Sequence, residues 1–186
     1  MKTKKPGPFS INVRDIVHHP GEMREHELTV ALAEKWGEGI VAIEAGTDVE
    51  IDVRLESVHE GILATAEIHS VFDGVCGRCL TELSESVEVE IQELFAYSGD
   101  EATDFEVQDD HVDLEIPVRD AIVLSLPFQP VCQPDCPGLD PVTGERLTDA
   151  PMERADAPTD PRWAALQGFT DQASGAHSAE QNTEES

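Results

Sequence analysis

The sequence is short of positive charge. Of its 186 residues, 12 are Lys or Arg and 39 are Asp or Glu, so the formal net charge is −27. No lysine follows Lys35, and no Lys or Arg occurs between Arg78 and Arg119. Proteins bind nucleic acids largely through Lys and Arg, so a folded RNA-binding surface is disfavoured. A basic protein is the better electrostatic partner, although acids that only provide solubility or suit a salty cytoplasm also explain this composition.

Aromatic residues and long apolar runs are also scarce. Phe, Trp and Tyr make up 5% of the chain and hydrophobic residues 39%, which predicts a core of Val, Ile and Leu without a large ligand cavity. No apolar run approaches the roughly 20 residues needed to cross a bilayer. The first lysines are followed by Asn12, Arg14 and Asp15 rather than by the apolar segment of a signal peptide. We therefore expect a cytoplasmic protein that does not contact membranes.

The motifs of common catalytic sites are missing. The sequence has no Gly-x-Ser-x-Gly elbow, phosphate-binding loop, His-Glu-x-x-His helix or glycine-rich dinucleotide turn. His18 and His19 are expected in a solvated polar loop. Asp109 and Asp110 are expected in a solvated acidic loop, where a weak Mg²⁺ or Ca²⁺ site would lack the EF-hand pattern. We predict that the protein is not an enzyme.

Alternation of apolar and polar residues predicts a sheet. The pattern is clearest over residues 49–56 and 62–69, which we interpret as a hairpin, and a further strand is predicted over 87–97. Weaker runs at 9–17 and 40–45 suggest additional strands. Short connections between successive strands favour an antiparallel meander.

The period changes to that of a helix after an acidic loop at residues 100–113. Apolar residues recur at helical spacing over 118–126, with Asp113 as a candidate cap, Pro117 in or before the first turn, and Pro127 after the last. One helix laid across an antiparallel sheet predicts an α+β fold.

Composition divides the chain into regions. Residues 1–8 are predicted to form a basic flexible arm, and residues 9–169 an α+β domain with a core over 9–140 and a C-terminal extension over 141–169. Residues 170–186 are expected to be a disordered acidic tail.

The four cysteines form two pairs in loops rich in Gly or Pro. Cys76 and Cys79 follow the predicted hairpin, and Cys132 and Cys136 follow the predicted helix. If the helix packs on the sheet, the two loops meet at one end of the domain. Four thiolates would then make a closed, structural zinc site.

Other uses of these cysteines remain open. A reducing cytosol favours metal ligands or redox thiols over disulfides. The first pair, spaced x2, is usual for zinc, and the x3 spacing of the second is less so. Cys76-Gly-Arg-Cys79 also looks like a thioredoxin-type dithiol, but that chemistry needs a cysteine at a helix N-terminus, and a strand-like run follows here.

Several segments together resemble the YceD family in its actinobacterial form. They are residues 51–63, Cys76-Gly-Arg-Cys79-Leu80, residues 113–127 with Cys132 and Cys136-Pro-Gly-Leu139, and Asp160-Pro-Arg-Trp-Ala-Ala-Leu166. Many relatives of this form continue after the Gly-Leu with two more cysteines spaced x2, where this chain has Asp140 and Thr143. The resemblance therefore leaves four thiols for a single site, and we do not expect Asp140 to add an oxygen ligand.

The resemblance implies a role in the accumulation or processing of large-subunit ribosomal RNA, without enzymatic activity. Combined with the charge, it predicts an accessory protein of ribosome biogenesis that binds a basic ribosomal protein or a large-subunit assembly factor. The alternative is a thiol redox enzyme or sensor that uses Cys76 and Cys79. Direct RNA binding would depend on Lys2, Lys4 and Lys5 alone and is not expected.

Overall fold

The computed structural model describes residues 6–97, 105–147 and Arg162. The chain divides into two units, Met1–Thr148 and Asp149–Ser186, and every strand and helix described below belongs to the first. Most of the predicted basic arm, the C-terminal extension beyond residue 147 apart from Arg162, and the predicted tail lie outside the described residues.

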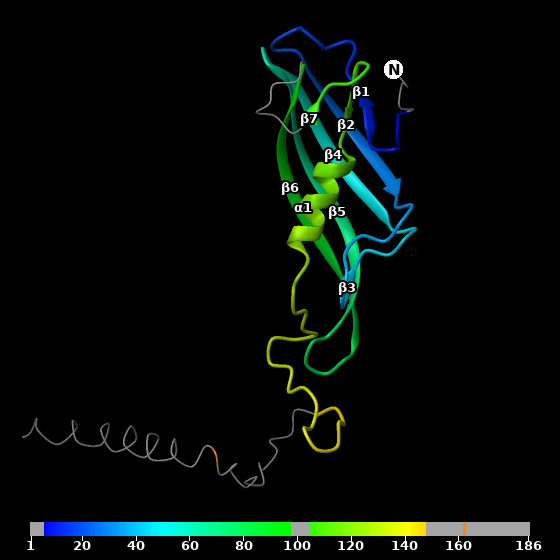
Figure 1. Ribbon diagram of the computed structural model, residues 1–186, viewed down its shortest axis with the longest axis vertical. Coiled ribbons are helices and arrows are strands. Elements are labelled where there is room, and N and C mark those ends of the chain that lie inside the picture. The colour runs from blue at the N-terminus through cyan, green and yellow to red at the C-terminus, as the bar shows by residue number, and fades with distance from the viewer. Residues whose placement is uncertain (1–5, 98–104, 148–161, 163–186) are drawn as a thin grey trace, which may run out of the picture. The chain divides into compact units, whose positions relative to one another are not determined.

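The described part of the first unit contains a larger and a smaller sheet (Figure 1). The larger sheet has the strand order β2-β4-β5-β6-β7, with β3 also paired to β5. All its pairs are antiparallel except β6 with β7. The smaller sheet pairs β1 with β8. The strands are β1 (Ser10–Asn12), β2 (Met23–Ala31), β3 (Val41–Ala42), β4 (Asp48–Ser57), β5 (Gly61–Val75), β6 (Glu82–Ala96), β7 (Phe105–Glu106) and β8 (His111–Asp113).

The central hairpin confirms the alternation of the sequence. On β4 the apolar members of the pattern are buried and the charged residues between them are exposed. The register of β5 with β6 runs from Gly61–Ala96 to Val75–Glu82, so both strands are longer than predicted. Gly61 is required at one end, because a Cβ there would collide with the carbonyl oxygen of Phe95.

Helix α1 (Glu115–Ser125) lies across one face of the larger sheet and buries Val118 and Ile122 in the core (Figure 1). The capping residue is Leu114 rather than Asp113, and it makes no side-chain cap. The Asp113 carboxylate accepts the N–H of Glu115 at 3.2 Å instead. The predicted α+β class, an antiparallel sheet with one packed helix, is thus the architecture of the described residues.

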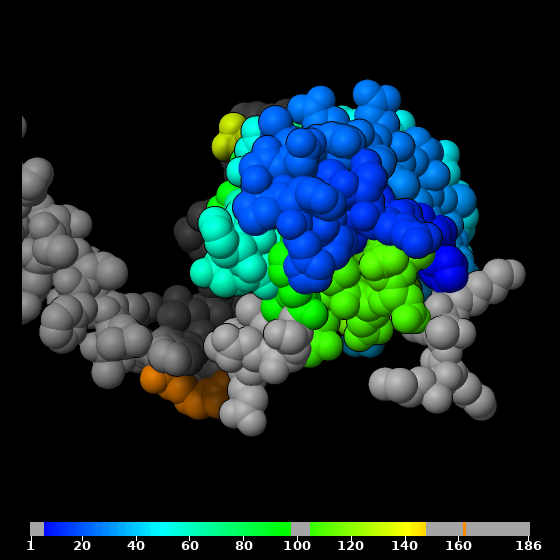
Figure 2. Space-filling model, turned by 90° about the horizontal axis from the view of Figure 1, so that it is seen from above, coloured from blue at the N-terminus to red at the C-terminus, as the bar shows by residue number. Residues whose placement is uncertain are grey.

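The N-terminal segment differs from the predicted strand over residues 9–17. Only β1 is extended, and the chain then turns, with Val13 accepting the N–H groups of Ile16 and Val17. Val13 and Ile16 are buried by this turn, so their apolar spacing reflects core contacts rather than a strand. Figure 2 shows this end of the unit, where the blue N-terminal segment lies against the green segment that contains β8.

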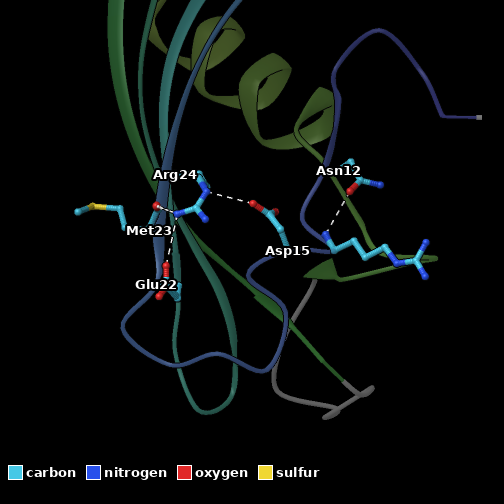
Figure 3. Close-up of polar contacts among 6 residues, drawn as sticks. Asn12, Asp15, Glu22, Met23 and Arg24 are labelled. Carbon is cyan, nitrogen blue, oxygen red and sulfur yellow. Dashed lines mark hydrogen bonds and ion pairs between the residues drawn. The ribbon is translucent and has the colours of Figure 1, made fainter.

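Strand β2 was not predicted, because Met23–Ala31 carries no regular apolar alternation. It is an edge strand of the larger sheet and pairs with β4 along its whole length. Its start is fixed by Arg24, whose Nε lies 3.0 Å from Asp15 Oδ2 and whose Nη1 donates to the carbonyl of Met23 at 2.7 Å (Figure 3). Pairing and side-chain contacts, rather than local pattern, therefore define this strand.

Candidate metal centre

The first cysteine pair occupies the tight connection between β5 and β6. Cys76 donates its N–H to the carbonyl of Thr81 at 2.8 Å, and Leu80 donates back to the carbonyl of Cys76 at 3.0 Å. These bonds turn the chain sharply, so that Cys76 and Cys79 both lie in the interior, 0% and 7% exposed.

The second pair comes from the segment that follows α1. The N–H of Gly77 donates to the carbonyl of Pro130 at 2.8 Å, which joins this segment to the first cysteine turn. The N–H of Cys136 donates to the carbonyl of Gln133 at 3.1 Å and closes a second turn. Cys136 is buried, whereas Cys132 is exposed.

The four sulfurs lie within 4.8 Å of one another. Cys76 Sγ is 3.9 Å from Cys136 Sγ, and Cys79 Sγ is 3.6 Å from Cys132 Sγ. These separations exclude disulfides, in which the sulfurs are about 2.05 Å apart. A tetrahedral Zn²⁺ with Zn–S bonds of about 2.3 Å places its sulfurs about 3.8 Å apart, so the cluster fits that geometry. The predicted convergence of the two loops is confirmed.

Two arginines tie the first cysteine turn to the segment that follows α1, and sequence reasoning missed both. Arg78, in the first turn, donates Nη1 to the carbonyls of Pro134 and Cys136 in the second, at 3.0 and 3.2 Å. Arg146 donates Nε and Nη2 to the carbonyls of Cys79 and Leu80, at 3.0 and 3.2 Å. Arg78 has a signal in the sequence, since it lies between the two cysteines of the first pair, whereas Arg146 follows Cys136 by ten residues and has none.

Hydrogen bonds divide the thiols into two kinds. The backbone N–H of Cys132, followed by that of Cys79, lowers the pKa of Cys76 to about 6. The hydroxyl of Thr81 lowers the pKa of Cys79. The neighbouring Cys79 side chain raises the pKa of Cys132 to about 12, and burial raises the pKa of Cys136. The ionised form is thus favoured in the first pair and disfavoured in the second, and ionisation of all four sulfurs calls for a cation.

The first cysteine turn also carries backbone strain. Leu80 has φ of +56°, in the left-handed region that disfavours side chains.

The Cys76-Gly-Arg-Cys79 motif lies in a β-hairpin connection rather than at a helix N-terminus. In thioredoxin-type enzymes a helix N-terminus lowers the pKa of the catalytic thiol. Cys76 and Cys79 do not have this position.

Asp140 lies outside the sulfur cluster. Its Oδ1 accepts the N–H groups of Val142 and Thr143, both at 2.7 Å, and the bond from Thr143 is the main cause that lowers the pKa of Asp140. The carboxylate closes a turn in its own segment. It occupies, with Thr143, the positions where the resemblance placed a further cysteine pair.

The remaining candidate residues form no comparable site. His18 and His19 are exposed, with the His18 ring 4.2 Å from that of Tyr97. Asp109 and Asp110 are the central residues of a tight turn closed by Gln108 and His111. Among the described residues, the four cysteines are the one group of three or more Cys, His, Asp or Glu close enough to share an ion. None of the described helical residues forms a segment long and apolar enough to span a bilayer.

Comparisons with known proteins bear on the same region. The model of a family described as large ribosomal RNA subunit accumulation protein YceD matches residues 64–170, which include all four cysteines. An uncharacterised protein of Mycobacterium bovis and one of Mycobacterium tuberculosis are each 41% identical over 167 residues, 86% of this chain and 80% of the relative. One of Mycobacterium leprae is 34% identical over 166 residues, 86% of this chain and 76% of the relative. No solved structure matches.

Proposed function

The chain belongs to the YceD family of large ribosomal RNA subunit accumulation proteins, and from this premise we propose that it is a non-enzymatic accessory protein of ribosome biogenesis. In this role it supports the accumulation of large-subunit ribosomal RNA by binding a basic ribosomal protein or assembly factor. The proposed process, ribosome biogenesis, rests on the family assignment. The proposed mode of contact rests on the charge distribution of the sheet.

We propose that the four cysteines bind one structural Zn²⁺. The ion supplies a fixed crosslink between the two turns and, with four sulfur ligands, leaves no open position for a substrate. Cys76 and Cys79 hold it from the hairpin, and Cys132 and Cys136 hold it from the segment after α1. Arg78 and Arg146 keep both turns in place and offset the net negative charge of a tetrathiolate zinc site.

The observation that carries the mode of contact is a row of four carboxylates across the sheet. The strand register places Glu27 opposite Asp52, Asp52 opposite Glu67, and Glu67 opposite Glu90. All four are exposed, and their neighbours along each strand are buried or partly buried, so the row faces away from α1. We call these four residues the carboxylate row.

Like charges directly opposite each other in a sheet destabilise it, because facing side chains are only about 4.5–5.5 Å apart. Acids also flank the carboxylate row, at Glu50 and Glu88 on either side of His69. A cationic partner would relieve this repulsion, and phosphates would increase it. The face therefore favours a basic protein over RNA, and steers such a partner most strongly at low salt.

A pair of matched variants tests this function. We expect Asp52→Asn with Glu67→Gln, in the carboxylate row, to lower affinity for purified large-subunit ribosomal proteins about tenfold at low salt, measured by titration with each protein. The control, Glu60→Gln with Glu106→Gln, removes two exposed acids elsewhere and should bind like the wild type.

Cells without the protein should accumulate less large-subunit than small-subunit ribosomal RNA, measured as the ratio of the two. The proposal fails if no large-subunit protein or assembly factor binds the wild type, or if the two double variants bind equally well. An unchanged ratio of ribosomal RNAs would contradict the role itself.

The redox alternative makes a different prediction for the same cysteines. A redox enzyme or sensor presents a thiolate that reacts as purified, whereas thiols in a zinc site react with a thiol reagent only after chelation. A thiol count before and after chelator treatment, with metal analysis of the reduced protein, separates the two. One tightly held zinc per chain with protected thiols would exclude the redox function.

A further inference from the structure

Large apolar side chains are exposed where α1 ends. Phe128 is 91% exposed, Leu124 is 85% exposed, and Ile40 on the facing loop is 46% exposed. These three residues line a hollow of about 620 Å³, with Leu126 and Pro127. We call it the helix-end hollow. Apolar surface gathered in a concave site, rather than scattered singly, marks a surface that contacts another molecule.

The hollow is formed by well-fixed backbone. Leu126 has the extended conformation that the following proline imposes (φ −59°, ψ 135°), and Pro130 restricts the chain two residues after Phe128. Pro130 is also held by its hydrogen bond from Gly77. Phe128 is therefore presented between the helix and the cysteine turns with little backbone freedom to lose on binding, as a binding anchor requires.

The loop that faces the end of α1 forms the opposite wall of the hollow and is closely packed at Gly37. A Cβ at Gly37 would lie 3.0 Å from Leu126 Cδ1 and 3.1 Å from the carbonyl oxygen of Val41. A side chain at this position would press against both residues, and Gly37 has φ of +96°, which favours glycine. The hollow is thus a fixed feature of the fold.

Acidic residues lie in the hollow and in its neighbour. Glu38 lines it directly, and a second hollow of about 560 Å³ shares Ile40 and Val41 with it. The second hollow is lined by Glu44, Asp73 and Glu82, and by Lys35, which pairs with Glu44 at 3.0 Å. Across both hollows, four acids face one lysine that is already paired.

We propose that the helix-end hollow binds an apolar side chain of a basic protein segment, with Phe128 and Leu124 as the contacting anchors and the surrounding acids as partners for Lys or Arg. This inference rests on the proposed function and extends it, because it locates a second contact point for the same class of partner. A second copy of the chain is a poorer occupant, since two chains of net charge −27 repel each other.

Peptide titration tests the chemistry of the occupant. The probe is a short peptide of repeated Lys-Lys-Leu-Leu, compared with one that has Ser in place of Leu and one that has Glu in place of Lys. The full chain should bind the Lys-Leu peptide at least about tenfold more tightly than either of the others. Amide chemical shifts should change around Ile40, Leu124 and Phe128.

Variants test the residues. Leu124→Ala with Phe128→Ala should weaken binding of the Lys-Leu peptide about tenfold or more, without altering the thermal midpoint by more than a few degrees, because both side chains are exposed. The control is Ile116→Ala, which removes an apolar side chain of α1 that is 60% exposed and does not line the hollow. It should bind the peptide like the wild type.

Each outcome decides the proposal. Equal binding by the double variant and the wild type overturns it, as does preference for the acidic peptide or a peptide-induced shift confined to the carboxylate row. Self-association of the wild type that the double variant abolishes, measured by light scattering, would make a second copy the occupant and also overturn it. If Leu124→Ala with Phe128→Ala still binds ribosomal proteins normally while the carboxylate-row variant does not, only this inference fails and the proposed function stands.

Discussion

Different interactions stabilise the two ends of the first unit. The sheet and α1 enclose a continuous core of buried aliphatic and aromatic side chains. At the cysteine turns, the buried cluster consists of Cys76, Cys79 and Cys136, with Leu83 and Val131 partly buried against it. An apolar core stabilises the fold in proportion to the apolar surface that it removes from water. A cluster as small as that of the cysteine turns buries too little surface and needs a crosslink. The comparison shows that this end has little hydrophobic burial of its own, and the structural zinc that we propose would supply the crosslink.

The largest effect should come from loss of the metal. Structural zinc contributes about 10–16 kcal/mol of apparent binding free energy in small zinc peptides. We expect Cys76→Ser to abolish tight binding and to accelerate amide hydrogen exchange more than about tenfold in residues 130–147, while exchange in β4 and β5 changes little.

Chelation of the wild type provides the control. It should reproduce the exchange pattern of Cys76→Ser, and chelator added to the variant should change nothing further. Equal acceleration throughout the sheet would mean that the two ends unfold together, and the comparison would not hold.

Metal affinity should fall as the pH falls. The raised pKa values of Cys132, about 12, and of Cys136 mean that both thiols keep their protons at pH 7 without metal and must release them on binding. Cys76, with its pKa lowered to about 6, is already ionised. Release of at least these two protons lowers the affinity at least about a hundredfold for each pH unit between 8 and 7. Competition with a chelator of known affinity at both pH values measures this, and an affinity independent of pH would contradict it.

A truncation in the apolar core should act only on the sheet end. Phe95 is 1% exposed, and its ring centroid lies 5.5 Å from that of Phe105. Phe95→Ala should lower the free energy of unfolding by about 3–5 kcal/mol, measured by denaturant titration. Phe95→Leu, as the milder variant, should cost about 1.5 kcal/mol. Metal affinity should be unchanged in Phe95→Leu, and a parallel loss of affinity would show that the two ends are coupled.

The arginines should affect the cysteine end alone. Arg78→Met or Arg146→Met removes donors to two carbonyls of the cysteine turns and should lower metal affinity about 10- to 100-fold. Arg119→Met is the matched control, because Arg119 is exposed and pairs only with Glu34, at 3.4 Å, among the contacts described. Chelator competition gives the affinities, and an equal loss in all three variants would point to net charge rather than to position.

The smallest effect concerns the strained residue of the first turn. Leu80→Gly removes a side chain from the left-handed region and should raise the metal-free stability of the cysteine end by about 1 kcal/mol, seen as slower amide exchange in residues 76–81. The leucine is 58% exposed, so little burial is lost. Faster exchange in the variant would show that the Leu80 side chain stabilises the turn through contacts.

Sequence patterns predicted the elements in which apolar residues recur at a regular spacing. The hairpin of β4 and β5 and the buried side of α1 follow from residue spacing alone, because one face of each element is apolar. β2 was missed because an edge strand needs no such pattern when a neighbouring strand supplies its hydrogen bonds. The strand expected over 9–17 was too long, because Val13 and Ile16 reach the core from a turn.

The four cysteines could be proposed as a site from their spacing, whereas the residues that hold them could not. Arg78 and Arg146 bind backbone carbonyls, and any residue offers a carbonyl, so no partner is identifiable in the sequence. The helix-end hollow was equally hidden, because the exposure of Phe128 depends on where α1 ends and which loop faces it.

By itself the sequence determined the family, the acidic character, the strands with alternating faces and the presence of four thiols, because these depend on residue identity and local spacing. Only the tertiary structure decided which carboxylates stand opposite one another and that the two cysteine turns meet. Strand register and the packing of α1 bring together residues far apart in the sequence, such as Cys76 and Cys136, which are 60 positions apart. Such distances are fixed by the pairing and packing of the whole unit, not by any local segment.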